Sequence, residues 1–471
     1  MTRQRHELTH HVPATDQRLS KPTAAVAFAL ALVALWLNLL ASGRLYAADT
    51  GKTPELPPAL ANYVNRPEPK FRWELRERKS AGGATIFDLA LVSQEWHSIV
   101  WEHQLQVYQP EGAHPAATML LWNQGGTASD RSMAFGMDLA RRIKTPVAFL
   151  YGIPNQPLLG GKKEDTLIAE TFVRHLETKD DTWPLLFPMV KSLVKAMDAL
   201  QEFSRKEWNQ PLLSFVVSGA SKRGWTTWLT AAADPRVKGI VPMVIDTLNM
   251  REQGPYQVKS FGKYSDQIND YTERGLVPMP DTPEARRLWS MVDPWVYREK
   301  IAVPKLLING NNDPYWTSDA LNLYWDDLKG DKWVLYVPNA GHNLEQQSAG
   351  APPSRERAVG GLAAFAHYLI ADRPLPKLRW KHDDAGGKAR LSVDAQPAPL
   401  AGRLWLARAE TRDFRLAQFV EQPLAVDAGK VVAQIANPTE EHVAFFAELD
   451  YDVDGLKHHF STQLRILEPA R

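Results

Sequence analysis

The chain has 471 residues, 44 % of them hydrophobic and 23 % charged, as in an ordinary globular protein of one or two domains. Its 55 basic and 54 acidic residues give a net charge of only +1, too small to attract DNA or RNA, so nucleic acid is not expected as a partner. It contains no cysteine, which excludes disulfides, thiolate metal sites and cysteine nucleophiles.

The first 48 residues have the pattern of an export segment. A basic, polar stretch precedes the apolar run from Ala24 to Ala41, and small residues follow that suit cleavage after Ala47 or Ala48. The run is long for a cleaved signal and short for a spanning helix, so residues 1–48 are predicted to be a signal peptide or an N-terminal membrane anchor. Both alternatives place the bulk of the chain outside the cytoplasm, in the periplasm or secreted.

Residues 49–373 alternate between two patterns. Apolar runs that stop at glycine turns, such as ATMLLWNQGG and LLSFVVSGAS, predict buried strands. Amphipathic runs between them, such as TLIAETFVRHLE, PMVKSLVKAMDALQEF and WTSDALNLYWDDL, predict helices. This alternation is typical of an α/β domain with a mostly parallel sheet covered on both faces.

The pattern of hydrophobic and polar residues changes near Arg373, where prolines end the last predicted helix. Residues 374–471 contain only short strand-like runs, among them KARLSVDA, GRLWLARA, LAQFV, KVVAQIA and VAFFAELDY. Their regular spacing predicts a small C-terminal β-sandwich-like domain.

A candidate nucleophile follows one of the predicted buried strands. In SFVVSGASKRGW, Ser221 stands at the strand-to-helix junction with Gly219, Ala220 and Gly224 around it. Small residues are needed there because the backbone of such a turn is tight and strained. The usual pattern has glycine two residues after the serine, where this chain has Arg223, and that departure weakens the motif on its own.

Two later strands supply the remaining members of a catalytic triad. PKLLINGNND ends in Asp313 and KWVLYVPNAGHN contains His342, in the chain order Ser, Asp, His of α/β-hydrolases. His342 is therefore predicted as general base and Asp313 as the acid that orients it. Asp246, at the end of the strand after Ser221, is a rival acid. Asp319 is a weaker rival, since it is expected on a solvated helix face.

An oxyanion hole requires two hydrogen-bond donors near the nucleophile. The backbone N–H of Lys222 is predicted as one donor, and the loop NQGGT, through Gly125, Gly126 or Thr127, as the other. The Lys222 side chain is expected either to help bind an anionic group or to point to solvent.

The stretch 247–300 has a looser pattern, rich in tyrosine and tryptophan, and is predicted to be a cap-like insertion over the sheet edge. No metal or cofactor is expected. HExxH, Walker and dinucleotide motifs are missing, and adjacent histidines on a strand, as in His458-His459, point to opposite faces.

Several of these segments together resemble one known family. The runs EDTLIAETFVRHLETKDDTWPLLFPMVKSLVKAMDAL, GASKRGWTTWLTAAADPRVKGIVPMVIDTLN, PNAGHN and ETRDFR resemble the PhoPQ-activated pathogenicity-related proteins. The resemblance implies an exported α/β-hydrolase-like domain followed by a β-rich domain, with Ser221, Asp313 and His342 as the triad. It also implies that Arg223 belongs to the family's own elbow.

The resemblance leaves the substrate and the oligomeric state open. A serine hydrolase acting on small peptides or esters is the main expectation, with a link to antimicrobial-peptide resistance. The alternatives are a non-catalytic, hydrolase-like binding or signalling protein and an esterase of the glucuronoyl type, whose elbow is similar. A peptidase would need carboxylates near the cleft to hold an amino terminus. Glu164, Asp165 and Glu170 are available for this, although a solvated helix face is the expected place for them.

Overall fold

The computed structural model describes residues 56–469. The predicted signal peptide or anchor, residues 1–48, lies outside the described residues. Among residues 56–469, no helix combines the length and the apolar character needed to cross a membrane.

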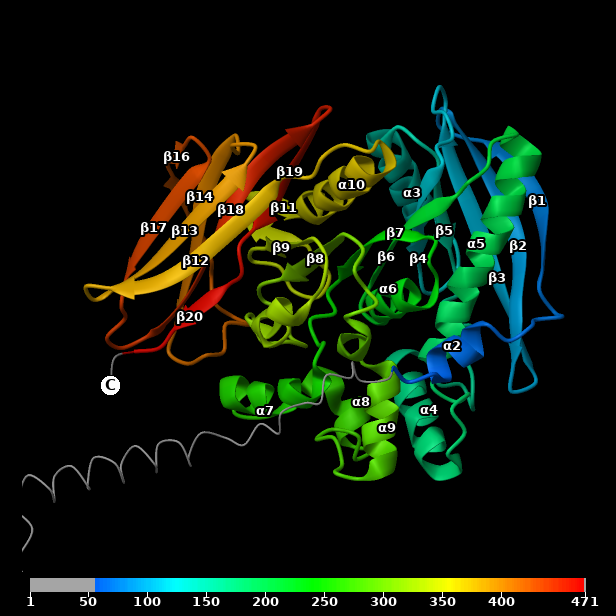
Figure 1. Ribbon diagram of the computed structural model, residues 1–471, viewed down its shortest axis with the longest axis horizontal. Helices are drawn as coiled ribbons and strands as arrows, with labels where there is room; N and C mark the ends of the chain where they lie inside the picture. The colour runs from blue at the N-terminus through cyan, green and yellow to red at the C-terminus, as the bar shows by residue number, and fades with distance from the viewer. Residues whose placement is uncertain (1–55, 470–471) are drawn as a thin grey trace, which may run out of the picture. The chain divides into compact units, whose positions relative to one another are not determined.

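A large mixed sheet forms the centre of the protein (Figure 1). Its hydrolase part runs in the spatial order β1-β2-β3-β5-β4-β6-β7-β8-β9. Pairing is antiparallel from β1 to β5 and parallel from β5 to β9. The strands are β1 (Arg72–Ser80), β2 (Ala84–Trp96), β3 (Ile99–Pro110), β4 (Thr118–Asn123), β5 (Val147–Leu150), β6 (Ser214–Ala220), β7 (Val237–Met243), β8 (Lys305–Gly310) and β9 (Lys332–Val337).

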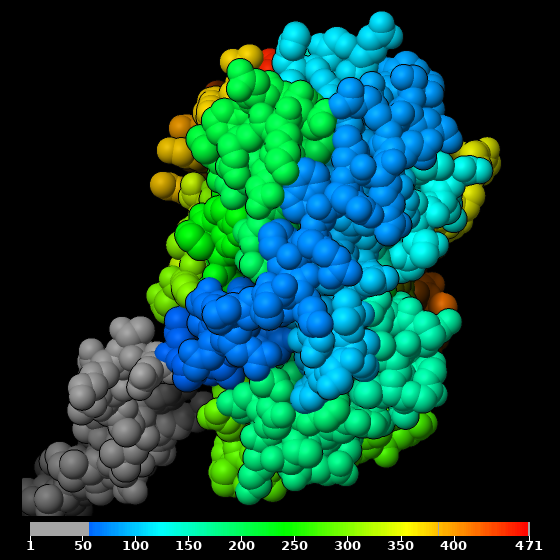
Figure 2. All heavy atoms as spheres, turned by 90° about the vertical axis from the view of Figure 1, so that its right-hand side faces the viewer, coloured from blue at the N-terminus to red at the C-terminus, as the bar shows by residue number. Residues whose placement is uncertain are grey.

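This strand order is that of the α/β-hydrolase fold, as the sequence predicted. The strands from β4 to β9 are apolar on both faces because helices cover both faces. One core contains α2 (Ala59–Val64), α5 (Leu186–Trp208) and α6 (Lys222–Ala233), and the other contains α3 (Asp130–Ile143) and α10 (Glu356–Ile370). Figure 2 shows the segment that carries α2, in dark blue, beside the strands of the β1–β3 edge.

The stretch 247–300 forms a group of short helices near α4 (Glu164–Thr178) at one end of the protein (Figure 1). These are α7 (Met250–Phe261), η1 (Asp266–Ile268), α8 (Asn269–Thr272), α9 (Pro283–Val292) and η2 (Pro294–Tyr297). They follow β7 and lie at the edge where the parallel strands end, which is where α/β proteins form their sites.

The C-terminal strands form two antiparallel layers, in agreement with the predicted β-rich region. One layer has the order β12-β13-β17-β16, and the other has the order β19-β18-β14-β15 with β20 beside β18. The second layer continues the central sheet, because β19 pairs with β9 at Ser461 and Val334. The strands are β12 (Lys377–Ala385), β13 (Lys388–Gln396), β14 (Ala401–Ala409), β15 (Val420–Leu424), β16 (Val426–Asp427), β17 (Lys430–Ala436), β18 (His442–Val453), β19 (Leu456–Ser461) and β20 (Arg465–Leu467).

Two local predictions were wrong. The stretch 316–328 is not an α-helix but two 3-10 turns, η3 (Ala320–Leu323) and η4 (Trp325–Asp327). Buried tertiary contacts of Tyr324 and Trp325 outweigh the helical pattern there. The run LAQFV lies mostly in a loop, since β15 begins only at Val420. A small hairpin, β10 (Gln346–Ser348) and β11 (Ala351–Ser354), follows the His342 loop.

Candidate active site

Ser221 lies at a sharp turn between β6 and α6. Its backbone has φ 59° and ψ −128°, a conformation that costs free energy for any residue with a side chain. The turn is held by the Ser221 N–H, which donates to the Met243 carbonyl at 2.8 Å, and by the Ser221 carbonyl, which accepts from Trp225 N–H. This is the geometry of a nucleophile elbow.

The residues around the elbow are small because neighbouring groups approach closely. A Cβ on Gly219 would collide with the Asn123 side-chain amide, and one on Gly224 would lie 2.8 Å from Ile245. The Asn123 amide donates to the carbonyls of Ser218 and Arg223, at 2.9 and 3.2 Å. The glycine requirement in this chain therefore falls at Gly219 and Gly224, which explains how Arg223 can occupy the position where glycine is usual.

Asp313 and His342 lie together, although 29 positions separate them. Asp313 follows β8 and His342 follows β9, so adjacent parallel strands deliver both to one edge of the sheet. The Nδ1 of His342 is 2.8 Å from Oδ2 of the buried Asp313, and Asp313 also accepts the Tyr315 N–H at 2.9 Å. The Tyr315 ring stacks on the imidazole with 4.2 Å between centroids. A proton on Nδ1 leaves the Nε2 lone pair free to accept another.

The two rival acids have other partners. Asp246 is buried and accepts a hydrogen bond from the Tyr324 hydroxyl at 2.5 Å. Burial raises the pKa of Asp246 to about 7, with the nearby charge of Asp313 adding to the effect. Asp319 is buried rather than solvated, so that expectation was wrong: it accepts from the Tyr256 hydroxyl and the Arg412 guanidinium at 2.6 and 2.8 Å. The imidazole is thus paired with Asp313.

Four charged side chains form a closed cluster beside the elbow, which we call the charge quartet: Glu164, Asp165, Lys222 and Arg223. Lys222 Nζ lies 2.9 Å from Glu164 and 3.0 Å from Asp165. Arg223 donates both terminal nitrogens to Glu164 at 2.6 and 2.7 Å. Burial would raise the pKa of Glu164, but the hydrogen bonds and charges of Arg223 and Lys222 outweigh it and hold that pKa well below its usual range. Glu164 and Asp165, whose side chains are 42 % and 18 % exposed, are thus ion-paired with Lys222 and Arg223 rather than free on a solvated helix face as expected, and the Lys222 side chain does not point to solvent.

The loop that carries Gly125 and Gly126 lies against the same elbow. A Cβ on Gly125 would collide with the Arg223 guanidinium, and Gly126 has the left-handed φ of 66°. Lys222 is the first residue of α6, so its backbone N–H is one of the orphan donors of a helix start. These are suitable groups for an oxyanion hole, and that role is part of the proposal below.

Comparison with known proteins identifies relatives of this chain. Residues 60–415 match the family described as PhoPQ-activated pathogenicity-related protein. Autocrine proliferation repressor protein A of Dictyostelium discoideum is 31 % identical over 384 residues, 76 % of each chain. The chain belongs to the PhoPQ-activated pathogenicity-related protein family.

Solved structures with the same general fold are more distant. Acetyl xylan esterase 1 from a Thermoanaerobacterium species is 19 % identical with a TM-score of 0.45, covering 68 % of this chain and 96 % of that one. A glucuronoyl esterase from Solibacter usitatus is 14 % identical with a TM-score of 0.38, covering 61 % and 88 %. At these scores they add nothing to the assignment made from the strand order.

The family match ends within a loop that contacts the segments carrying Asp313 and His342 from a distant part of the chain. This β14–β15 loop, residues 410–419, carries the ETRDFR motif. The Asn312 amide, next to Asp313, donates to the carbonyls of Phe414 and Ala417 at 2.8 Å each. Asn339, three residues before His342, exchanges two hydrogen bonds with the Phe419 backbone at 2.9 and 2.7 Å. These contacts join positions 80 to 105 residues apart, so no local sequence pattern indicated them.

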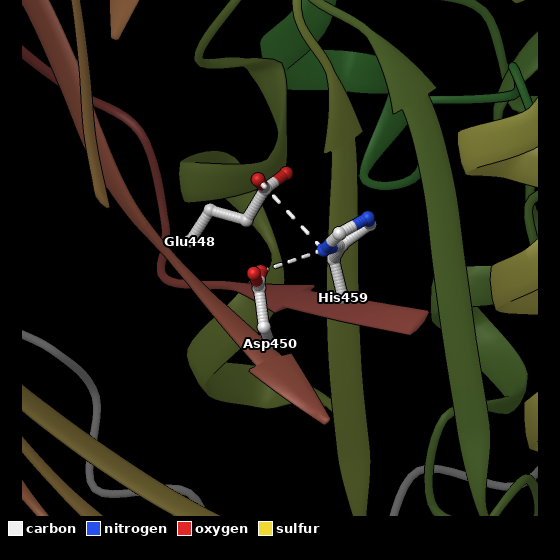
Figure 3. Close-up of side chains that lie close together, drawn as sticks. All are labelled: Glu448, Asp450 and His459. Atoms are coloured by element: carbon white, nitrogen blue, oxygen red, sulfur yellow. Dashed lines mark hydrogen bonds and ion pairs between the residues drawn. The ribbon is translucent and has the colours of Figure 1, made fainter. Parts of the chain in front are cut away.

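A cluster of three side chains outside the family match consists of residue types that can bind a metal ion. Figure 3 shows Glu448 and Asp450 of β18 facing His459 of β19, whose Nδ1 is 2.8 Å from Asp450 and 4.0 Å from Glu448. Arg403 donates to both carboxylates, and Arg357 also pairs with Glu448. A divalent cation would have to displace both guanidinium groups, so we interpret the cluster as an ion-pair network between C-terminal strands.

Proposed function

We propose that this chain is a serine hydrolase in which Ser221 is the nucleophile, His342 the general base and Asp313 its orienting acid. The observation that carries the proposal is that a strained serine elbow and a hydrogen-bonded pair of the buried Asp313 and the half-buried His342 follow strands β6, β8 and β9 at one edge of the sheet. A scaffold that only bound a ligand would have no need for the strained backbone of Ser221.

The mechanism follows from these groups. His342 Nε2 takes the hydroxyl proton as Ser221 Oγ bonds to the substrate carbonyl carbon, and the carbonyl π electrons move onto oxygen. The N–H of Lys222 and an N–H of Gly125 or Gly126 stabilise that oxyanion. When the tetrahedral intermediate collapses, the bond to the leaving group breaks and His342 returns the proton to it. Water then repeats the sequence on the acyl-enzyme and releases a carboxylic acid.

The charges near the elbow bear on the choice between a peptide and an ester. Glu164 and Asp165 are paired with Lys222 and Arg223, and Glu170 is paired with Lys162 and Arg174. These carboxylates are therefore not offered to the amino terminus of a peptide. The proposed substrates are esters, or internal peptide bonds recognised without the chain terminus.

The setting of the reaction is also part of the proposal. Export by the N-terminal segment would place the enzyme in the periplasm or outside the cell, either free or tethered to the membrane. The family description links its members to pathogenicity. Antimicrobial peptides are accordingly one proposed physiological substrate.

A second function has one observation in its favour. The Dictyostelium relative is named for autocrine repression of proliferation, which is a signalling role. In that case the fold would bind a partner and the triad would be idle. A glucuronoyl-type esterase is a further alternative on the similarity of the elbow, and it predicts turnover of methyl glucuronate.

Labelling with a fluorophosphonate tests the proposal directly, because this probe forms a covalent bond only with an activated serine. Full-length protein should be labelled, and labelling should be lost in Ser221→Ala and fall by at least about 10³-fold in rate in His342→Ala. Ser214→Ala, at the opposite end of β6, is the matched control and should be labelled like wild type. Folded wild-type protein that stays unlabelled would favour the signalling function.

A further inference from the structure

A cavity of about 280 Å³ opens beside Ser221 and is not explained by the triad. Ser221 and Lys222 are among the residues that line it, and α7 with residues 277–281 forms a large part of its wall. A volume at the small end of ligand sites suits one substituent of a substrate rather than an extended polymer.

The wall of this cavity is mostly apolar, although Thr247, Gln253 and Gln257 also line it. Indole, thioether and aliphatic groups line it from four segments of the chain, and they include Trp225, Ile245, Met250, Val277, Met279 and Trp289. Burying an apolar group of a ligand against such a surface is favourable, whereas a charged group would lose its hydration without gaining a partner.

The charges that border the cavity are already paired or lie at its rim. Lys222 Nζ is held between Glu164 and Asp165 at 2.9 and 3.0 Å, and the Tyr271 hydroxyl donates to Asp165 at 3.1 Å. Arg251 and Asp281 also border the cavity, but both are exposed to solvent. Among the described residues that line the cavity, none therefore offers an uncompensated charge to a ligand inside it.

The position of the base decides which part of a substrate enters. His342 must give its proton to the leaving group, so the leaving group lies beside the imidazole. The cavity is lined by Tyr315, whose ring is stacked on His342 at 4.2 Å, while the imidazole itself is not among the described residues that line it. The Tyr315 ring thus separates the cavity from the leaving-group side.

We propose that this cavity binds the acyl part of the substrate and selects a bulky, uncharged, apolar acyl group, such as an arylalkyl or branched aliphatic group. This inference rests on the hydrolase function proposed above. A well-filled apolar pocket raises kcat/KM by about 10- to 200-fold relative to a substrate that lacks the group.

Three esters with one leaving group test the selectivity. The p-nitrophenyl esters of acetate, 3-phenylpropionate and succinate differ only in the acyl part. We expect kcat/KM for the 3-phenylpropionyl ester to exceed that for the acetyl ester by at least about tenfold, and the succinyl ester, with its free carboxylate, to be the poorest. A succinyl ester that is preferred, or equal values for all three, would overturn the proposal.

Gly254 on α7 permits the cavity to be filled without disturbing the fold. It lines the cavity, and an added Cβ would meet only a Tyr264 ring carbon, at 3.5 Å. Leucine is also a stronger helix former than glycine, so Gly254→Leu should fold. It should lower the ratio of 3-phenylpropionyl to acetyl turnover by at least about tenfold. Val258→Leu, one turn along on the exposed side of α7, should keep the wild-type ratio. The same ratio in Gly254→Leu and wild type would contradict the assignment.

A binding measurement separates this inference from the hydrolase proposal. In Ser221→Ala, which cannot turn over, 3-phenylpropionamide should change the fluorescence of the tryptophans that line the cavity, and succinamate should not. Gly254→Leu in the same background should weaken the binding by at least about tenfold. Binding of the amide with no fluorophosphonate labelling of wild type would refute the hydrolase and the acyl role together. Labelling and turnover without amide binding would refute only the cavity assignment.

Discussion

The two halves of the candidate site are supported in different ways. Ser221 is positioned by residues of β6, α6 and the neighbouring strand β4, namely Gly219, Gly224 and the Asn123 amide. The Asp313–His342 pair sits on two loops that are braced from outside the hydrolase sheet, by the β14–β15 loop. The nucleophile is therefore built locally, whereas the base depends on a part of the chain that a hydrolase sheet alone would not contain.

The link between the base and the C-terminal strands extends to the cavity wall. Arg412 of the β14–β15 loop donates to Tyr256 of α7 and to Asp319 at 2.6 and 2.8 Å. Arg415 lies over the Phe261 ring, also on α7, at 4.0 Å. The β14–β15 loop thus contacts the loop that carries Asp313, the loop that carries His342, and helix α7, which lines the cavity. This gives the C-terminal region a structural reason to accompany the hydrolase fold.

The largest effect is expected at the acid. Asp313→Asn should lower kcat by roughly 10³- to 10⁴-fold, because an amide cannot stabilise the imidazolium and favours the wrong tautomer. Asp246→Asn should lower kcat by less than about tenfold, since Asp246 is bonded to Tyr324 rather than to His342. Steady-state kinetics on one ester measure both. A larger loss in Asp246→Asn than in Asp313→Asn would reverse the assignment of the acid.

A smaller loss of reactivity is expected when the hydrogen bonds between the β14–β15 loop and the loops that carry Asp313 and His342 are removed. Asn312→Ala, and Asn339→Gly at its left-handed φ of 56°, each delete two hydrogen bonds to the β14–β15 loop without adding backbone strain. Each bond contributes about 1 kcal/mol, so we expect a 10- to 100-fold lower rate of fluorophosphonate labelling.

The final extent of labelling distinguishes positioning from folding in these variants. A slower rate with full final labelling shows that folded protein has a poorly positioned base. A reduced final extent shows loss of folded protein instead, and would contradict the positioning role. Asn343→Ala, in the same loop, is the control and should keep the wild-type rate, because within residues 56–469 the Asn343 side chain bonds to the neighbouring Glu345 and not to the β14–β15 loop.

The same contrast explains what the sequence could predict. The fold class, the elbow and the positions of Asp313 and His342 were predictable because each depends on a local pattern: a strand, a turn and a residue type at its end. The burial of Asp319 and the partners of Glu164 were not, because both depend on side chains from segments far along the chain, Arg412 for one and Arg223 for the other. The continuation of the sheet from β9 to β19 could not be predicted either. It depends on a single bridge between two segments that are far apart in the sequence and have different residue patterns.

The smallest of these effects is expected at the charge quartet beside Ser221. It should change the free energy of unfolding more than the rate of reaction. Glu164→Gln removes one of the two carboxylates paired with Lys222, and it removes the carboxylate paired with Arg223. Because the Glu164 side chain is 42 % exposed and water can replace part of the interaction, we expect a loss of about 1–2 kcal/mol at pH 7. The pKa of Glu164 is lowered in the folded state, so its contribution is complete above its unfolded pKa of about 4.3 and disappears as the pH falls through the lowered value.

Chemical denaturation of wild type and Glu164→Gln between pH 3 and pH 7 therefore provides the test, and their difference in unfolding free energy should shrink toward the acid end. Glu170→Gln is the matched control on α4, since Glu170 makes pairs with Arg174 and Lys162 at the protein surface and should cost less than about 1 kcal/mol. A difference that grows as the pH falls would mean that Glu164 is not held ionised by the elbow cations, and the charge quartet would then lose its role in supporting the nucleophile side.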